Sequence, residues 1–386
     1  MRFSDAARSE LADPRSRRTR RQAAAEARAR RADATGDVPA WEALREAGAA
    51  IRDRTLRELG THLETLETAV GEEGGQVHWA RDAAEARRVI GRLLPSEATG
   101  HAPLALVRSD VTDEIGLEGG EPGPHTKAAI VGAGFLVAET GTVVVTDRGE
   151  GLSFPGTLVV VAGLEDIVPD WTDLEVLLQL IARAGAGRPM HPAVATRTGE
   201  IQLVLLDNGR TKVLADPDGR EALRCVHCSA CSAVCPVFER TGPRPYGQGR
   251  AGPIGAVLTP QVRGVEASLG ASLPFASTLC GACADVCPVK IDIPGMLVHL
   301  RGRVVESRRR RPVPTPELLL MRGLAWSMGD ERRYEQTLVR RARWARLLAR
   351  NGRIRRLPGL FGKWTDARDL PAPPRQSFRA WWRRRR

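Results

Sequence analysis

Seven cysteines gathered into two short segments constrain this chain more than any other feature. Residues 225–236 read CVHCSACSAVCP, and residues 277–288 read STLCGACADVCP. Disulfide frameworks are typical of short secreted chains with an even number of cysteines. This chain has 386 residues and an odd number of cysteines. The clustered thiols are therefore expected to be metal ligands.

The spacing of the first segment, Cys-x2-Cys-x2-Cys-x3-Cys-Pro, is typical of bacterial ferredoxins. Its two-residue gaps let three thiolates reach one iron–sulfur cube, while the fourth cysteine ligates the neighbouring cluster. The first cluster, a [4Fe–4S] cube, is then predicted to be held by three thiolates of the first segment and one of the second: Cys225, Cys228, Cys231 and Cys287. The second cluster is predicted to be held by the remaining three: Cys235, Cys280 and Cys283. Zinc would use tetrahedral sets of four, and seven ligands do not divide by four.

The second cluster lacks a fourth cysteine, and the same spacing counted back from Cys280 reaches Ser277. Three outcomes are open: a [3Fe–4S] cluster, a [4Fe–4S] cluster whose fourth ligand is Ser277, water or a partner group, or a labile fourth iron. A loop serine more often makes an ordinary hydrogen bond. His227 lies between two predicted ligands, so we expect it to turn outward and tune the cluster through hydrogen bonds or solvent.

The region before the cysteines predicts an α/β layer. The spacing of apolar residues over 41–66 indicates a helix within a helical segment that covers residues 1–70, and helices are also predicted over 82–94 and 173–185. Several apolar runs rich in β-branched residues lack strict alternation, which favours a largely parallel sheet covered on both faces. These predicted strands are residues 76–79, 104–107, 128–139, 142–147, 157–163 and 201–207.

The basic character of the chain lies in its last part. Residues 301–386 contain 25 Lys and Arg against 7 Asp and Glu, a net charge of +18, so the other 300 residues carry −6. Such a tail could contact an acidic partner or an anionic membrane surface, or it could be a solvated helical surface. Its tryptophans lack the regular interleaving of a base-stacking platform, so we expect no nucleic-acid partner.

Targeting and nucleotide-binding signals are absent from the sequence. No run approaches eighteen apolar residues, and no apolar stretch follows the N-terminal arginines, so we expect no transmembrane segment, no export and a cytoplasmic location. The VGAGF stretch at 131–135 has Val137 where a dinucleotide fingerprint needs its third glycine. No flavin or nicotinamide site is therefore expected in this chain.

The order of motifs resembles the iron–sulfur protein B family of the bacterial L-lactate utilization system. The motifs that carry the resemblance follow along nearly the whole chain: AETGTVVVTDRGEG (138–151), LEDIVP (164–169), LVLLDNGR (203–210), CVHCSACSAVCPVF (225–238), GPIGAVLTP (252–260), STLCGACADVCPVKI (277–291) and FGKWTDARDLPAPPRQSFRAW (361–381). The three-cysteine second segment is also similar to that family.

The resemblance implies a fold and a function. It implies an α/β LUD domain, related to the NagB/RpiA/CoA-transferase-like fold, followed by a helical ferredoxin-type two-cluster domain and a basic helical tail. The expected boundaries are 1–75 for an N-terminal helical region, 76–215 for the LUD domain, 216–305 for the cluster domain and 306–386 for the tail. Family members oxidise L-lactate to pyruvate together with a CCG-domain iron–sulfur subunit and a second LUD-domain subunit. This chain would carry electrons and perform no substrate chemistry itself.

Two departures from the family concern the α/β region. VRSDVTDEIGLEG (107–119) is joined to AAIVGAGFLVAETGT (128–142) almost directly, so the LUD domain is expected to be shortened. Glu165-Asp166 stands where the family tends to have Glu-Arg before Ile-Val-Pro. Ligands of open α/β sheets gather at the carboxyl ends of strands, which makes residues 139–141 and 207–210 candidates, although both are also ordinary turn sequences. An alternative function is electron transfer for another 2-hydroxy acid, such as glycolate, or for a quinone-linked dehydrogenase.

Overall fold

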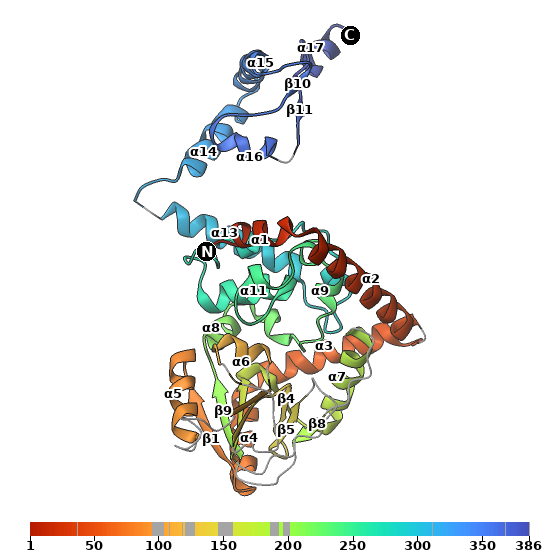
Figure 1. Ribbon diagram of the computed structural model, residues 1–386, viewed down its shortest axis with the longest axis vertical. Helices are drawn as coiled ribbons and strands as arrows, with labels where there is room; N and C mark the ends of the chain where they lie inside the picture. Colours follow the sequence, from red (N-terminus) through yellow and green to blue (C-terminus); the bar gives the residue numbers. More distant parts are fainter. Residues whose placement is uncertain are drawn as a thin grey trace. The chain divides into compact units, whose positions relative to one another are not determined.

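A computed structural model describes the chain apart from residues 37, 95–103, 108, 118, 120–127, 146–156, 186–192, 196–200, 311, 367 and 386. The linker at 120–126, on which the predicted shortening depends, lies outside the described residues. The chain forms two compact units, residues 1–307 and residues 308–386. Figure 1 shows the course of the chain through both units.

Five parallel strands form the main sheet of the first unit, in the order β1-β9-β6-β3-β2. In that order the strands are β1 (Gln76–Ala80), β9 (Ile201–Leu206), β6 (Thr157–Gly163), β3 (Ala128–Gly132) and β2 (Leu104–Val107). One face is covered by α5 (Ala83–Leu93) and α6 (Asp110–Glu114), and the other by α4 (Leu59–Glu72) and a second sheet. Every residue of β3 is buried. This double covering explains the continuous apolar runs and confirms the predicted parallel α/β layer.

A second, mixed sheet has the order β7-β4-β5-β8. Its strands are β7 (Ile167–Val168), β4 (Phe135–Val137), β5 (Thr142–Val145) and β8 (Ala193–Ala195). The expectation of one strand over 128–139 is wrong, because the chain leaves the first sheet after β3 and enters the second as β4. The backbone N–H of Ala133 still bonds to Val161, whereas that of Gly134 already bonds to Val144 of β5.

The N-terminal helices are α1 (Phe3–Ala12), α2 (Pro14–Gly36), α3 (Trp41–Arg57) and α4. The predicted helix over 41–66 is interrupted at Glu58, which ends α3 and precedes α4. Helix α3 lies against α7 (Trp171–Ala184), whose N-terminus is capped by the Asp170 side chain. Helices α1 and α2 instead cover the cysteine region, which we define as residues 216–307 (Figure 1). Arg28 of α2 donates a hydrogen bond to the carbonyl of Ala233 in this region, at 3.1 Å.

The cysteine region is built from short helices and two loops that repeat at a distance of 52 residues, since CVHCSACSAVCP and STLCGACADVCP begin at 225 and 277. Helix α9 (Ala230–Val234) of the first loop corresponds to α12 (Ala282–Asp285) of the second. Around them lie α8 (Arg210–Leu214), α10 (Phe238–Thr241), α11 (Gly252–Arg263) and α13 (Ile293–Arg309), with single 3-10 turns at 220–224, 244–246 and 273–275. Apolar residues of α3, α7, α11 and α13 belong to one core, which also contains Cys231, Cys283 and Cys287.

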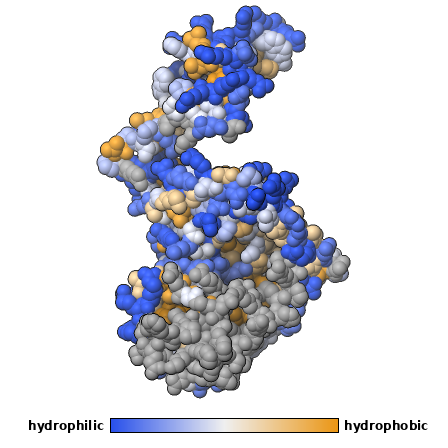
Figure 2. All heavy atoms as spheres, viewed as in Figure 1, coloured by the Kyte–Doolittle hydropathy of each residue, from blue (hydrophilic) through white to orange (hydrophobic). Residues whose placement is uncertain are grey.

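The second unit is helical and basic. It contains α14 (Pro316–Met328), α15 (Glu331–Leu347), α16 (Gly362–Thr365) and α17 (Phe378–Arg383), with a two-stranded ribbon of β10 (Arg353–Ile354) and β11 (Leu370–Pro371). Arg383 of α17 pairs with Glu335 of α15. Trp326 and Trp344 are 64% and 73% exposed, and Figure 2 shows apolar side chains beside hydrophilic ones on this unit. Among the described residues of both units, no helix is long and apolar enough to cross a membrane.

Candidate metal centre

The structure brings four cysteines to one cavity of about 430 Å³: Cys225, Cys228, Cys231 and Cys287. We call them the first cysteine set. Burial raises the pKa of the Cys231 thiol well above its ordinary value, and the neighbouring Cys225, Cys228 and Cys287 raise it further. The pKa of Cys228 is raised by burial and then by Cys287 and Cys225. Three thiols from the first loop and one from the second therefore share one buried space.

The other three cysteines form a second set: Cys235, Cys280 and Cys283. Burial raises the pKa of Cys283 to about 11, with Cys235 and Cys280 contributing. The pKa of Cys235 is raised by burial, then by Cys280 and Glu239. Cys280 is exposed, whereas its two companions are buried. The structure thus brings Cys235, Cys280 and Cys283 together, and none of the seven cysteines is in a disulfide; their roles as cluster ligands stay a prediction.

The backbone explains how each loop turns its thiols inward. His227 and Ser229, on either side of Cys228, have φ angles of 56° and 59°. At the equivalent places around Cys280, Leu279 and Gly281 have φ angles of 54° and 86°. Side chains other than glycine rarely adopt this left-handed region, and such strain clusters at functional sites. The same costly turn in both loops indicates a common purpose for the two sets.

Ser277 occupies the place in the second loop that Cys225 occupies in the first. Its hydroxyl accepts a hydrogen bond from the backbone N–H of Leu279 at 3.1 Å. Its carbonyl accepts another from the Arg301 guanidinium at 3.0 Å. This is the ordinary hydrogen bonding that we expected of a loop serine.

The chemistry of the two sets fits iron–sulfur clusters. Thiols whose pKa values are raised by burial and by one another do not ionise together in an empty cavity. A multivalent iron–sulfur core supplies the positive charge that would hold them as thiolates. The backbone N–H of Phe238 also points to the Cys235 sulfur at 3.4 Å, the kind of contact that tunes such clusters.

Cations surround the first set. Arg45 donates two hydrogen bonds to the Cys287 carbonyl, at 2.8 and 3.0 Å. Arg52, which is 1% exposed, donates to the carbonyls of Glu165, Ile167 and Leu223. Cys225 raises the pKa of both Arg52 and Arg250, although burial lowers that of Arg52 overall. Buried positive charge therefore faces the first set from more than one side.

A buried ionic network links the first set to the α/β region. Glu165, 1% exposed, accepts from Arg210 and, at 2.8 Å, from Arg250. Arg210 also pairs with Glu114 at 2.9 Å. Burial would raise the pKa of Glu165, but Arg210 and Arg250 outweigh it and lower the pKa to about 2. We define the strand-end network as these four residues together with His227 and its carboxylate partners Asp110 and Asp166.

His227 lines the cavity of the first cysteine set, and its ring nitrogens contact the α/β region. Its Nδ1 lies 3.0 Å from Asp110 and its Nε2 lies 3.1 Å from Asp166, so two carboxylates of the α/β region hold the ring. Burial and Arg250 lower the pKa of His227, yet the hydrogen bonds to both carboxylates prevail and raise it to about 10. Asp166 belongs to the pair, Glu165-Asp166, that we expected to depart from the family pattern, and its contact with His227 could not be predicted from the sequence.

The two predicted strand-end candidates have different places. Arg210, after β9, enters the strand-end network, and Asp207 accepts from the backbone N–H of Thr211 at 2.7 Å. Glu139 instead lies in the turn between β4 and β5 of the second sheet. The adjoining Gly141 contacts the backbone of α4 closely. The structure thus brings only the second candidate to the carboxyl edge of the parallel sheet.

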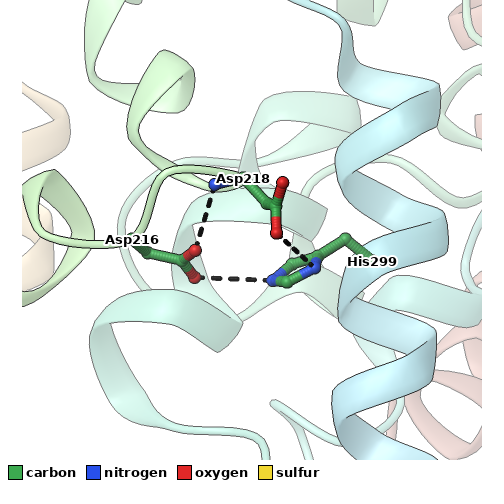
Figure 3. Close-up of side chains that lie close together, drawn as sticks. All are labelled: Asp216, Asp218 and His299. Carbon is green, nitrogen blue, oxygen red and sulfur yellow. Dashed lines mark hydrogen bonds and ion pairs between the residues drawn. The ribbon is translucent and has the colours of Figure 1, made fainter.

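Among the described residues, His299 of α13 and two aspartates that follow α8 form a further group of metal-ligand type. His299 is 3.5 Å from a carboxylate oxygen of Asp216 and 3.5 Å from one of Asp218 (Figure 3). Arg303 already neutralises Asp216 at 2.9 Å. We interpret this group as an ionic link that fastens residues 216–218 to α13.

Comparison with known proteins gives two family matches. A LUD domain matches residues 124–210, and a 4Fe-4S dicluster domain matches residues 221–291. The latter spans all seven cysteines. A solved structure of a DUF162 family protein from Deinococcus radiodurans is 17% identical, covers 38% of this chain and 98% of its own, and has a TM-score of 0.26, too low to support an argument.

Curated relatives match nearly the whole chain. Lactate utilization protein B of Oceanobacillus iheyensis is 32% identical over 433 positions, with 89% of this chain and 88% of the relative covered. The protein of the same name from an Exiguobacterium species is 30% identical, with 92% and 91% covered. The 433 aligned positions exceed the 386 residues of the chain, so this relative carries segments that the chain lacks. The chain therefore belongs to the lactate utilization protein B family, with a LUD domain followed by a 4Fe-4S dicluster domain.

Proposed function

We propose that this chain is an electron-transfer subunit of a complex that oxidises L-lactate to pyruvate. The observation that carries the proposal is the division of seven free cysteines into a set of four and a set of three within a dicluster domain. The names of the curated relatives supply the metabolic context. Iron–sulfur clusters supply one-electron chemistry at potentials that the surrounding protein adjusts.

The proposed ligands follow the two sets. The first set would hold a [4Fe–4S] cluster: Cys225, Cys228, Cys231 and Cys287. The second set would hold a [4Fe–4S] or a [3Fe–4S] cluster: Cys235, Cys280 and Cys283. The thiolates would hold the irons, the loop amides would orient the sulfurs, and burial of the first set would exclude water. The fourth corner of the second cluster would be vacant, labile, or held by Ser277, water or a partner group.

The substrate chemistry would belong to partner subunits. We propose a CCG-domain iron–sulfur subunit and a second LUD-domain subunit as the partners, meeting this chain in the cytoplasm. The second unit carries 23 Lys and Arg against 6 Asp and Glu. Its charge and its exposed tryptophans suit contact with an acidic partner or with an anionic membrane surface. Electron transfer for glycolate oxidation, or for a quinone-linked dehydrogenase, is the second candidate because it would need the same two clusters.

Anaerobic purification with iron and sulfide quantification tests the cluster assignment. Two cubanes would give about eight irons, and a [3Fe–4S] second site would give about seven together with an EPR signal in the oxidised protein. Fewer than about four irons would sink the two-cluster claim.

Lactate-dependent reduction tests the function. The chain is co-purified with the candidate partner subunits, and bleaching of the cluster absorbance is followed after addition of L-lactate, D-lactate or glycolate. We expect bleaching with L-lactate alone. Bleaching with glycolate alone would favour the second candidate, and no bleaching with any of the three would contradict the proposal.

A further inference from the structure

We propose that the carboxyl-end edge of the LUD sheet is, in this chain, an electrostatic seat for the first cluster and not a pocket for a small ligand. The edge is filled by the chain's own His227 and Arg250, which come from the cysteine region. The inference rests on the proposed function in one respect: the first cysteine set must hold a cluster.

The strand-end network lies at the carboxyl ends of the parallel strands. Parallel α/β sheets bind ligands beyond the carboxyl ends of their strands, because the loops that follow the strands converge there. In this sheet, Asp110 and Glu114 follow β2, Glu165 and Asp166 follow β6, and Arg210 follows β9. Carboxylates and a guanidinium from separate strand ends thus meet where a ligand would be expected.

Two residues of the cysteine region, His227 and Arg250, contact the carboxylates at these strand ends. Arg250, 7% exposed, reaches Glu165 at 2.8 Å, and its guanidinium also lies 2.9 Å from the His227 ring. The His227 ring bridges Asp110 and Asp166. The charged groups of the strand-end network are therefore paired mainly with one another and with the cysteine region, although the buried Nε of Arg250 makes no hydrogen bond and lies 3.9 Å from Asp110.

Little space remains beside Glu165 and Arg210. Among the described residues, the cavity beside Glu114, Glu165, Arg210 and Arg250 measures about 20 Å³, which holds a single water molecule and no organic ligand. Asp110, His227 and Arg250 also line the cavity of about 430 Å³ at the first cysteine set, which the first cluster would occupy. A side chain at Gly163 would overlap both Glu165 and Arg210, so the glycine at the end of β6 makes room for the protein's own ion pair.

The charges of Arg250 and Glu165 should act on the first cluster. Arg250 pairs with the Glu165 carboxylate at 2.8 Å and lines the cavity of the first cysteine set, where the Cys225 sulfur also acts on its charge. Charges in a buried, low-dielectric setting act more strongly than they do in water. A cation beside a cluster favours the extra electron of the reduced state, and an anion disfavours it. Arg250 should therefore raise the reduction potential of the first cluster, and Glu165 should lower it.

Opposite shifts in two variants test the seat. The full chain is loaded with clusters anaerobically, and both clusters are titrated by EPR-monitored reduction. We expect Arg250→Gln to shift the first cluster to lower potential and Glu165→Gln to shift it to higher potential, with the second cluster unchanged as an internal reference. Arg250→Lys, which keeps the charge, should stay near the unmodified protein.

Matched controls separate charge from folding. Asp173→Asn removes a buried carboxylate that pairs with Arg54 elsewhere in the LUD domain and should shift neither cluster. If Glu165→Gln does not fold, Glu114→Gln removes the next carboxylate of the network and should give a smaller upward shift. Shifts of one sign in both charge variants, or equal shifts of both clusters, would overturn the inference.

A binding experiment tests the other half of the proposal. L-Lactate, pyruvate and glycolate are each added to the loaded protein while its thermal unfolding is followed, and we expect no saturable stabilisation. Stabilisation that Glu165→Gln abolishes would show a ligand site and overturn the inference. A chain that holds no first cluster defeats the proposed function, whereas a loaded chain with unshifted potentials defeats only the seat.

Discussion

The two cysteine loops have the same backbone turn, but the two cysteine sets lie in different electrostatic surroundings. The first set faces buried cations, with Arg52 at 1% and Arg250 at 7% exposure. The second set has Cys280 at the surface, and the charge that acts on Cys235 is Glu239, which pairs with Arg28. Repetition of a loop therefore fixes the ligand geometry, while the rest of the fold gives each copy its own electrostatics and its own access to solvent.

The largest effect on cluster content should come from replacing a proposed cysteine ligand. Cys231→Ala should destabilise the first cluster and lower the iron content by about one to four irons, because it leaves only three thiolates to hold that cluster, as in the second set. Cys283→Ala should abolish the second cluster and leave the first. Iron analysis and EPR of both variants are the measurement. Loss of both clusters in Cys283→Ala would show that the sets are not independent.

The cation that joins the first set to the LUD domain should matter most for stability. Arg52→Met would leave three backbone carbonyls without their donor, and we expect a loss of about 3 kcal/mol in the free energy of unfolding. Arg54→Met, on the same helix, removes a half-exposed partner of Asp173 and should cost about 1 kcal/mol or less. Denaturant unfolding measures both. Equal losses would mean that Arg52 has no special place in the fold.

The open corner of the second set should make it the more fragile of the two. Cys280 is exposed and Ser277 stands in place of a cysteine, so brief mild oxidation should remove iron from the second cluster first. Ser277→Cys should slow that loss by restoring a fourth thiolate. The time course of the cluster EPR signals after addition of oxidant measures the effect. Faster loss from the first cluster would reverse the comparison.

A small shift should come from the cation at Cys287. Arg45→Gln removes the donor to the Cys287 carbonyl and a charge that lowers the pKa of that thiol, which burial otherwise raises. We expect the first cluster to move to slightly lower potential while the second stays. An EPR-monitored titration would contradict this if the second cluster moved by the same amount.

The proximity of the thiols within each set could be predicted from the sequence because it depends mainly on local spacing. Two-residue gaps place three thiols on one turn of chain, and the Cys-Pro of each loop crosses to the other set. The parallel strands were also predictable, since continuous β-branched runs need cover on both faces. The break of the 41–66 helix at Glu58 is marked in the sequence only by Gly60, two residues later, which the regular spacing of apolar residues outweighs.

The strand-end network could not be predicted in the same way. Arg250 and Glu165 are 85 residues apart, and His227 and Asp110 are 117 apart. Only the parallel order of the strands and the docking of the cysteine region on their ends bring these side chains together. The sequence does predict Arg210 at a strand end. Arg250, which shares the Glu165 carboxylate with Arg210, comes from the residues just before α11.

The crossing of Cys287 into the first set has a consequence for synthesis of the chain. On the proposed assignment, the ribosome delivers three ligands of the first cluster by residue 231 but the last only at residue 287. A nascent chain that stops between these points presents an incomplete and reactive set of thiols. Completion of the first cluster would thus report that translation has passed the second loop, and cofactor insertion would act as a checkpoint on chain length.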